Sequence, residues 1–153
     1  MTKEVVPLII DGREVQSPTH FPVISPNTAE PIWNASSASK QDAISAAEAA
    51  LRAFPTWSNS RVQDRRRTFL KAANLVEERA EELQSYMKQE TGALDQFAGF
   101  NTTLSADLLR EIAGRISASL TGSIPVCSDE GTQALVLKEP YGVVLAIAPW
   151  YVH

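Results

Sequence analysis

The sequence holds one cysteine and two histidines, the residue types that most often supply nucleophiles, general bases and metal ligands near neutral pH. Cys127 precedes Asp129 and Glu130, and neighbouring carboxylates repel the negative charge of the reactive thiolate. His20 and His153 lie far apart along the chain and provide no metal-ligand spacing. We therefore expect Cys127 to be a structural thiol, and we expect no metal site and no internal disulfide.

The motifs that identify common catalytic and nucleotide-binding sites are missing from the sequence. It contains no G-x-G-x-x-G, Walker A, G-x-S-x-G or H-E-x-x-H pattern. Sequons occur at Asn34 and Asn101, but the first residues form no long apolar signal segment, so we interpret both sequons as chance matches. The residues alone therefore define no independent catalytic constellation.

Composition restricts the class of protein and its partners. The 153 residues are 44% hydrophobic and 21% charged, which is typical of a globular chain long enough for one domain core. The net charge of -4 disfavours a nucleic-acid partner, because affinity for phosphates depends mainly on Lys and Arg. No apolar run approaches the roughly 20 residues of a membrane span. We expect a cytoplasmic protein that binds neither nucleic acid nor membrane.

The first 38 residues (1–38) are expected to form a small antiparallel β layer. Short apolar stretches alternate with turn signals, because Asp11-Gly12 suits a tight hairpin and Ser25-Pro26-Asn27-Thr28 suits a second turn. Extended segments are predicted at about 5–10, 13–15, 21–24 and 31–36.

Residues 39–121 follow the 3.6-residue period of helices, and three long helices are predicted there. The first begins with a capping box formed by Ser39 and Asp42 and is expected to end at Pro55. The second begins at a similar signal at Ser60, is about seven turns long if unbroken, and ends at Gly92.

The third helix is predicted over about 94–120. Apolar residues recur along one stripe of it, but Gly, Asn and Thr at 99–103 weaken its first half. We therefore expect a kink or a break near those residues.

The strand period returns after Gly122. Residues 132–139 alternate in a strand pattern, and residues 143–148 form an unbroken apolar run, which is typical of a strand buried on both faces of a parallel sheet. Such a strand needs neighbours reached through crossovers of a dozen or more residues, and only five residues follow it. The sequence predicts an α/β protein in which residues 143–153 begin a parallel sheet that the chain does not complete.

The stretch from Lys138 to Trp150 resembles the aldehyde dehydrogenase superfamily, which carries the pattern E-P-x-G-V-V-x-x-I-x-P-W-N where its members enter the cofactor-binding domain. Other matching segments occur in the family's order, namely Ile9-Ile10-Asp11-Gly12, Ile24-Ser25-Pro26-Asn27-Thr28, Arg65-Arg66 and Glu90-Thr91-Gly92. Residues 122–125 resemble most the salicylaldehyde and vanillin dehydrogenase branch. The resemblance covers about residues 7–150 and implies a truncated aldehyde dehydrogenase-like fold that ends at the first strand of a Rossmann-like cofactor domain.

The resemblance implies roles for individual positions. In the family a cysteine thiolate attacks the aldehyde, hydride passes to NAD or NADP, and a glutamate serves as general base for hydrolysis to the acid. The positions of Ile147, Ala148, Pro149 and Trp150 form part of the wall beside the ribose and nicotinamide, largely through backbone groups. The next family position is an asparagine that helps to hold the oxyanion. Here it is Tyr151, whose phenol is not expected to place a donor within the roughly 3 Å that such a site demands.

The family's nucleophile, base and phosphate-binding loop all lie downstream of the matching region. Cys127 is not a replacement, because its segment precedes the paired strands that pack between subunits in the family. We therefore expect that this chain alone does not oxidise aldehydes. Agreement through Trp150 and departure at 151–153 lead to the hypothesis of a frameshift, a retained intron or a truncated gene model.

Three interpretations remain open. The first is the N-terminal part of an NAD(P)-dependent dehydrogenase of aldehydes, aromatic ones if the branch resemblance holds. The second is a non-catalytic interaction protein, because residues 132–139 resemble the strands that the family extends to another subunit and would allow homo- or hetero-oligomers with full-length subunits. The third is an unstable fragment, because residues 143–148 would be an apolar strand without its sheet.

Overall fold

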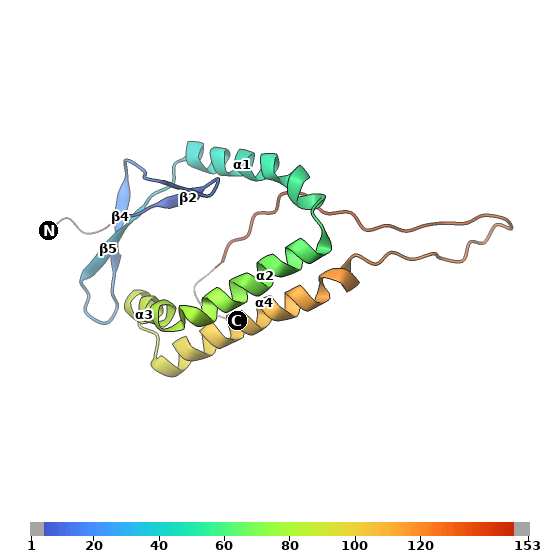
Figure 1. Cartoon of the computed structure of the whole chain (residues 1–153). Helices are drawn as coiled ribbons and strands as arrows, with labels where there is room; N and C mark the ends of the chain where they lie inside the picture. Colours follow the sequence, from blue (N-terminus) through green and yellow to red (C-terminus); the bar gives the residue numbers. More distant parts are fainter. Residues whose placement is uncertain (1–4, 149–153) are drawn as a thin grey trace.

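A computed structural model of the chain describes residues 5–148 and has the predicted mixed α/β architecture (Figure 1). The strands are β1 (Val5–Val6), β2 (Leu8–Ile10), β3 (Arg13–Val15), β4 (His20–Ile24) and β5 (Pro31–Ser36). The helices are α1 (Lys40–Ser58), α2 (Val62–Glu78), α3 (Ala80–Thr91) and α4 (Asp95–Ser119). The strands form one end of the molecule, the helices its body, and an extended hairpin leaves the far end of α4 (Figure 1).

The hairpin turn predicted at Asp11-Gly12 is confirmed. β2 and β3 pair antiparallel with Ile10 opposite Arg13, so the loop between them has two residues. Both have positive φ, 55° for Asp11 and 70° for Gly12, as a type I′ turn requires. The hairpin packs against α1.

The other three strands form a sheet in the order β1-β5-β4. β4 and β5 are antiparallel, but β1 runs parallel to β5, with Val5 opposite Asn34. The predicted antiparallel pairing is therefore confirmed for β2 with β3 and for β4 with β5, and the parallel pairing of β1 with β5 was not predicted. Period-two alternation records which face a side chain takes but not the direction of the neighbouring strand. The β2–β3 hairpin and β4 together form the long connection that a parallel pair needs.

The first helix begins as predicted and ends later. In its capping box the Ser39 Oγ accepts from the Asp42 N–H at 3.2 Å, and the Asp42 Oδ2 accepts from the Ser39 N–H at 2.8 Å. The helix then continues past Pro55 to Ser58. Pro55 lacks an N–H donor, so the helix loses one hydrogen bond there. The Pro55 carbonyl still accepts from the Asn59 N–H, and the helix continues for another turn.

The second predicted helix is two helices. It breaks at Arg79 into α2 and α3, and it ends at Gly92 as predicted, with a φ of 72°. Ser60 is not its cap, because the Ser60 hydroxyl donates to the Trp57 carbonyl at 2.6 Å. Apolar spacing continues across Arg79, so the period of the sequence did not reveal the break.

The helix is not broken near residues 99–103, because α4 is one continuous helix of 25 residues. The polar side chains in its first half bond to carbonyls of the preceding turn. Thr102 Oγ1 lies 3.2 Å from the Ala98 carbonyl and 2.9 Å from the Gly99 carbonyl, and Asn101 Nδ2 donates to the Phe97 carbonyl at 2.9 Å. These bonds satisfy the polar groups of Asn101 and Thr102 within the helix.

Small residues form the core where α4 packs against α2 and α3. Ala73, Ala98, Ala106 and Ala113 are each at most 2% exposed. In the described part of the chain every buried hydrophobic residue is an alanine, and no large side chain is fully buried. The helices therefore pack closely, while the large apolar side chains of α4, such as Phe100, Leu108 and Ile112, are left exposed.

The total surface is large for the mass. The chain exposes 12138 Å², about 1.6 times the roughly 7,600 Å² expected for a compact protein of its size. The extended hairpin and the segment that follows it add to this surface, because their large side chains are exposed. The fold thus leaves substantial apolar surface available for contact with further protein.

Candidate functional site

α4 is followed by an extended hairpin, here called the arm (residues 122–137), which projects from the helices and returns (Figure 1). One antiparallel bridge holds its two stretches together. The Ser123 N–H donates to the Val136 carbonyl at 3.1 Å, and the Val136 N–H donates to the Ser123 carbonyl at 2.9 Å. A Cβ on Gly122 would lie 2.2 Å from the Val136 oxygen, so the close approach requires glycine there. Pro125 has no N–H, so it cannot donate to the facing stretch and extend the ladder.

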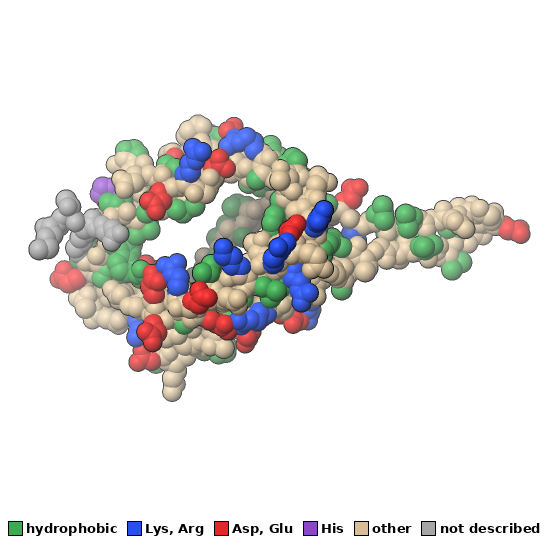
Figure 2. Space-filling model, viewed as in Figure 1, with side chains coloured by type: hydrophobic (Ala, Val, Ile, Leu, Met, Phe, Trp, Pro, Cys, Tyr) green, Lys and Arg blue, Asp and Glu red, His purple; other side chains and the backbone are tan. Residues whose placement is uncertain are grey.

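The arm has one strongly apolar face. Residues opposite each other in an antiparallel pair share a face, and residues two apart along a strand share it too. The bridge therefore places Ile124, Val126, Leu135 and Leu137 on the same face, and these side chains are 77%, 101%, 66% and 70% exposed. Figure 2 shows hydrophobic side chains along the arm and acidic side chains at its tip. The arm is an exposed apolar ribbon.

The predicted first strand of the cofactor sheet, residues 143–148, is extended and unpaired. Its backbone has no hydrogen-bond partner among the described residues, and its large side chains are exposed, Leu145 to 85% and Ile147 to 88%. Ala148 is exposed as well. Of the other residues predicted at the site, Pro149, Trp150 and Tyr151 lie outside the described residues.

The two chemically reactive residue types in the described part do not meet. Cys127 is half-buried in the arm, and its Sγ lies 3.9 Å from the Pro125 carbonyl, its one hydrogen-bond contact there. His20 is exposed at the start of β4, at the opposite end of the molecule from the arm (Figure 1). Residues 5–148 contain no group of three or more His, Cys, Asp and Glu that could hold a metal ion. No helix among them is long and apolar enough to cross a membrane.

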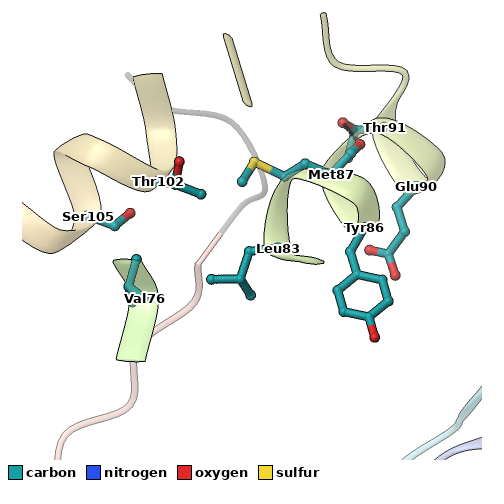
Figure 3. Close-up of a pocket in the computed structure, with 8 residues that line it drawn as sticks. All are labelled: Val76, Leu83, Tyr86, Met87, Glu90, Thr91, Thr102 and Ser105. Atoms are coloured by element: carbon teal, nitrogen blue, oxygen red, sulfur yellow. Dashed lines mark hydrogen bonds between the residues drawn. The ribbon is translucent and has the colours of Figure 1, made fainter. Parts of the chain in front are cut away.

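A pocket of about 400 Å³ lies between α2, α3 and α4 (Figure 3). Leu83 and Met87 of α3 point toward Thr102 and Ser105 of α4 across it. The Thr102 hydroxyl, besides its bonds within α4, accepts from Gln84 Nε2 at 3.0 Å. The lining is thus mostly apolar with a satisfied hydroxyl, and it offers no paired nucleophile and base.

An ion pair between Glu77 and Arg110 links α2 to α4. Arg110 donates through Nη1 and Nη2 to the two Glu77 carboxylate oxygens at 2.6 and 2.5 Å. This bidentate contact lowers the pKa of Glu77 and raises that of Arg110. Both side chains remain partly exposed, so the pair orients the helices more than it stabilises them.

Two side-chain contacts dock the β layer onto α3, and sequence patterns did not predict either of them. Asn27, in the turn after β4, donates through Nδ2 to the Lys88 carbonyl near the end of α3 at 3.0 Å. Trp33 of β5 packs edge-to-face on Tyr86 with ring centroids 5.8 Å apart. The Pro-Asn turn and the Glu-Thr-Gly helix end therefore meet in space, although more than sixty residues separate them.

The fold and site together define a class: a helical scaffold of an α/β protein that presents an extended arm and an unpaired apolar strand to further protein. The model of the aldehyde dehydrogenase family matches residues 13–152. The chain therefore belongs to the aldehyde dehydrogenase family.

Relatives with known names agree with this assignment. The chain is 37% identical over 147 residues to the vanillin dehydrogenase of Pseudomonas sp. (strain HR199 / DSM 7063), covering 95% of this chain and 30% of that protein. It is 35% identical over 141 residues to the salicylaldehyde dehydrogenase of Pseudomonas putida, covering 92% of this chain and 28% of that protein. The chain thus spans about 30% of the length of the curated relatives it matches.

Solved structures share the fold. The crystal structure of a salicylaldehyde dehydrogenase from Pseudomonas putida G7, complexed with salicylaldehyde, superposes with a TM-score of 0.83 at 30% identity, covering 89% of this chain and 28% of that one. A betaine aldehyde dehydrogenase from Staphylococcus aureus in complex with NAD+ gives 0.81 at 25% identity, covering 88% of this chain and 28% of that one.

Proposed function

We propose that these residues serve an NAD(P)-dependent aldehyde dehydrogenase that oxidises an aromatic aldehyde to the carboxylic acid. The observation that carries the proposal is the family match over residues 13–152, together with vanillin and salicylaldehyde dehydrogenases as relatives. In the proposed enzyme the described residues supply the helical layer, the arm and the first strand of the cofactor sheet.

Residues 143–148 fit a cofactor wall made of backbone groups. The segment is extended, and none of its described N–H or C=O groups has a partner, so these groups are available to neighbouring strands and to a ligand. The nicotinamide of NAD or NADP would accept the hydride when bound. In the proposal Ile147 and Ala148, with Pro149 and Trp150 after them, lie beside the ribose and nicotinamide and limit the access of water.

We further propose that a polypeptide of these 153 residues does not catalyse the reaction alone. Its single cysteine lies in the arm with no base beside it in the described part of the chain, and a thiol without an activating partner is a weak nucleophile. Tyr151 stands where the family has its oxyanion-binding asparagine.

A chimera tests the proposed function. Residues 1–150 of this chain would be joined to the remaining sequence of the vanillin dehydrogenase relative, and NADH formation with vanillin would be followed. We expect turnover by the chimera, with the intact relative as positive control. A chimera that assembles like the relative but forms no NADH would contradict the proposal.

The role of Tyr151 is tested in a second chimera that extends through this residue. Retaining Tyr151 should lower kcat about 10²–10³-fold relative to Tyr151→Asn, the usual effect of losing one oxyanion donor. The two chimeras should bind NAD equally. Equal kcat values would show that position 151 does not serve the oxyanion.

The exposed arm favours a second candidate function, in which the chain pairs with full-length subunits of the same family without catalysis. Its apolar face and its unpaired backbone groups could bind a further strand. Purified chain mixed with the full-length relative should then co-elute in size-exclusion chromatography. Separate elution at micromolar concentration would count against this candidate.

A further inference from the structure

A second cavity, of about 330 Å³, lies between the β layer and α3, at the end of the molecule opposite the arm (Figure 1). It is lined by Val6 of β1, Trp33 of β5, and Tyr86 and Glu90 of α3. Two aromatic rings, one aliphatic side chain and one carboxylate therefore border this space, which is here called the aromatic cavity.

The carboxylate of Glu90 has no ion-pair or hydrogen-bond partner among residues 5–148. Lys88, the basic residue of the same helical turn, donates instead to Asp95 Oδ1 at 2.9 Å. Glu90 also lies in the last turn of α3, where the negative end of the helix dipole adds to its charge. A positively charged ligand in the aromatic cavity would therefore meet a negative charge that the described residues leave uncompensated.

The aromatic rings supply a second attraction for a cation. The face of a tryptophan or tyrosine ring attracts ammonium groups within about 6 Å. The rings of Trp33 and Tyr86 stand at 86° to each other, and Tyr86 is 44% exposed. The Tyr86 hydroxyl donates to Glu82 Oε1 at 3.1 Å, and Arg79 holds that carboxylate through two hydrogen bonds at 2.8 and 2.7 Å. The ring is thus fixed in position beside Glu90 before any ligand binds.

The aromatic cavity adjoins the pocket between α2, α3 and α4, because Tyr86 and Glu90 line both. Figure 3 shows these two side chains next to each other on α3, with Met87 pointing away from them toward α4. The pocket is mostly apolar, through residues such as Val76 and Leu83. A ligand with its charge beside Glu90 can therefore extend an apolar group into the pocket.

We propose that the aromatic cavity binds an organic cation, an ammonium group that carries an apolar chain. The charged head lies against Glu90 and the rings of Trp33 and Tyr86, and the chain enters the pocket beside Leu83. A divalent metal ion would find one carboxylate among the described lining residues, too few oxygen ligands to replace its water shell. The inference goes beyond aldehyde oxidation and does not rest on it, so the chimera assay can fail while this site stands, and the reverse.

Titration of the 153-residue chain with hexyltrimethylammonium chloride, followed by amide NMR, tests the site. Saturable shifts are expected for the Trp33 indole N–H and for the amides of residues 86–91. Tetramethylammonium lacks the chain and should bind at least about tenfold more weakly, the effect of leaving about two CH₂ groups unburied. Hexanesulfonate has the same chain with the opposite charge and should cause no saturable shift.

Glu90→Gln keeps the shape of the side chain but removes its charge, and it should raise the dissociation constant of hexyltrimethylammonium at least about fivefold. Glu81→Gln is the matched control, because it makes the same charge change on α3 about two and a half turns away, on the opposite side of the helix. The control should bind as wild type does.

Trp33→Leu should weaken binding about three- to tenfold, and Trp33→Phe, which keeps a ring, should lose less. Circular dichroism of each variant verifies that the helices are retained. Three results would each overturn the proposal: shifts that rise linearly without saturation, equal shifts with potassium chloride, or equal dissociation constants for Glu90→Gln and Glu81→Gln.

Discussion

Gly92 lies where the turn after β4 meets the end of α3. Its φ is 72°, and a Cβ there would lie 3.1 Å from Pro26 Cγ and 3.2 Å from Asn27 Oδ1. Both the backbone conformation and the packing therefore require glycine. The turn that contains Pro26 and Asn27 therefore packs directly against the end of α3 at Gly92.

Gly92→Ala should lower the free energy of unfolding by about 1–2 kcal/mol, the cost of placing an L-residue in the left-handed region. Gly99→Ala is the matched control, because Gly99 lies inside α4 with nothing within 4 Å of an added Cβ. That variant should gain up to about 1 kcal/mol. Urea unfolding measures both, and an equal effect of the two substitutions would show that the left-handed end of α3 is unimportant.

At the scale of elements, the Glu77–Arg110 pair links the helices that contain most of the core. The pKa of Glu77 is lowered from its ordinary value of 4.5, chiefly by the hydrogen bond from Arg110. The folded state therefore binds this proton less tightly than the unfolded chain does. The associated stability is present above pH 4.5 and is lost as the pH falls through the lower folded value.

Glu77→Gln should consequently be less stable than wild type near neutrality, with a difference that shrinks as the pH falls below 4.5. Glu78→Gln is the control, because Glu78 is exposed and makes no ion pair among the described residues. Unfolding monitored by circular dichroism from pH 7 to 3 provides the test. A difference that grows toward low pH would have the wrong sign for this account.

Local chemistry made the capping box at Ser39, the Asp11-Gly12 turn and the Gly92 stop predictable, because each depends on residues within a few positions. The division at Arg79 and the parallel pairing of β1 with β5 depend on contacts between distant segments, which leave no period in the sequence. In the unbroken α4, Thr102 and Asn101 bond to carbonyls of their own helix, and propensity alone does not reveal this arrangement. The cofactor wall was predicted from the motif at residues 138–150 alone. In the structure Ile147 and Ala148 lie on an exposed, extended segment.

At the scale of the whole molecule, the buried core is small compared with the exposed apolar surface. Alanines fill the α2–α4 contact, while large side chains along α4, the arm and residues 143–148 remain exposed. The length of the chain permits a full domain core, but the fold directs its large apolar side chains outward. The described residues therefore offer apolar surface for contact with further protein and do not form a closed domain core.

Hydrogen exchange should reflect this distribution. Amides of α2 and α4 near Ala73 and Ala106 should exchange slowly, because they are hydrogen-bonded and packed. Amides of residues 143–148 should exchange at nearly the unprotected rate in the chain alone. Protection there equal to that of α4 would mean that the strand has found a sheet within this chain.

The central proposal is that these residues act as scaffold and contact surface in an aldehyde-oxidising enzyme whose reacting groups lie outside them. NADH formation with an aromatic aldehyde, measured in parallel for the 153-residue chain and for the vanillin dehydrogenase chimera, tests it most directly. The account predicts turnover by the chimera and none by the chain alone. Turnover that scales with the concentration of the isolated chain and disappears in Cys127→Ser would contradict it.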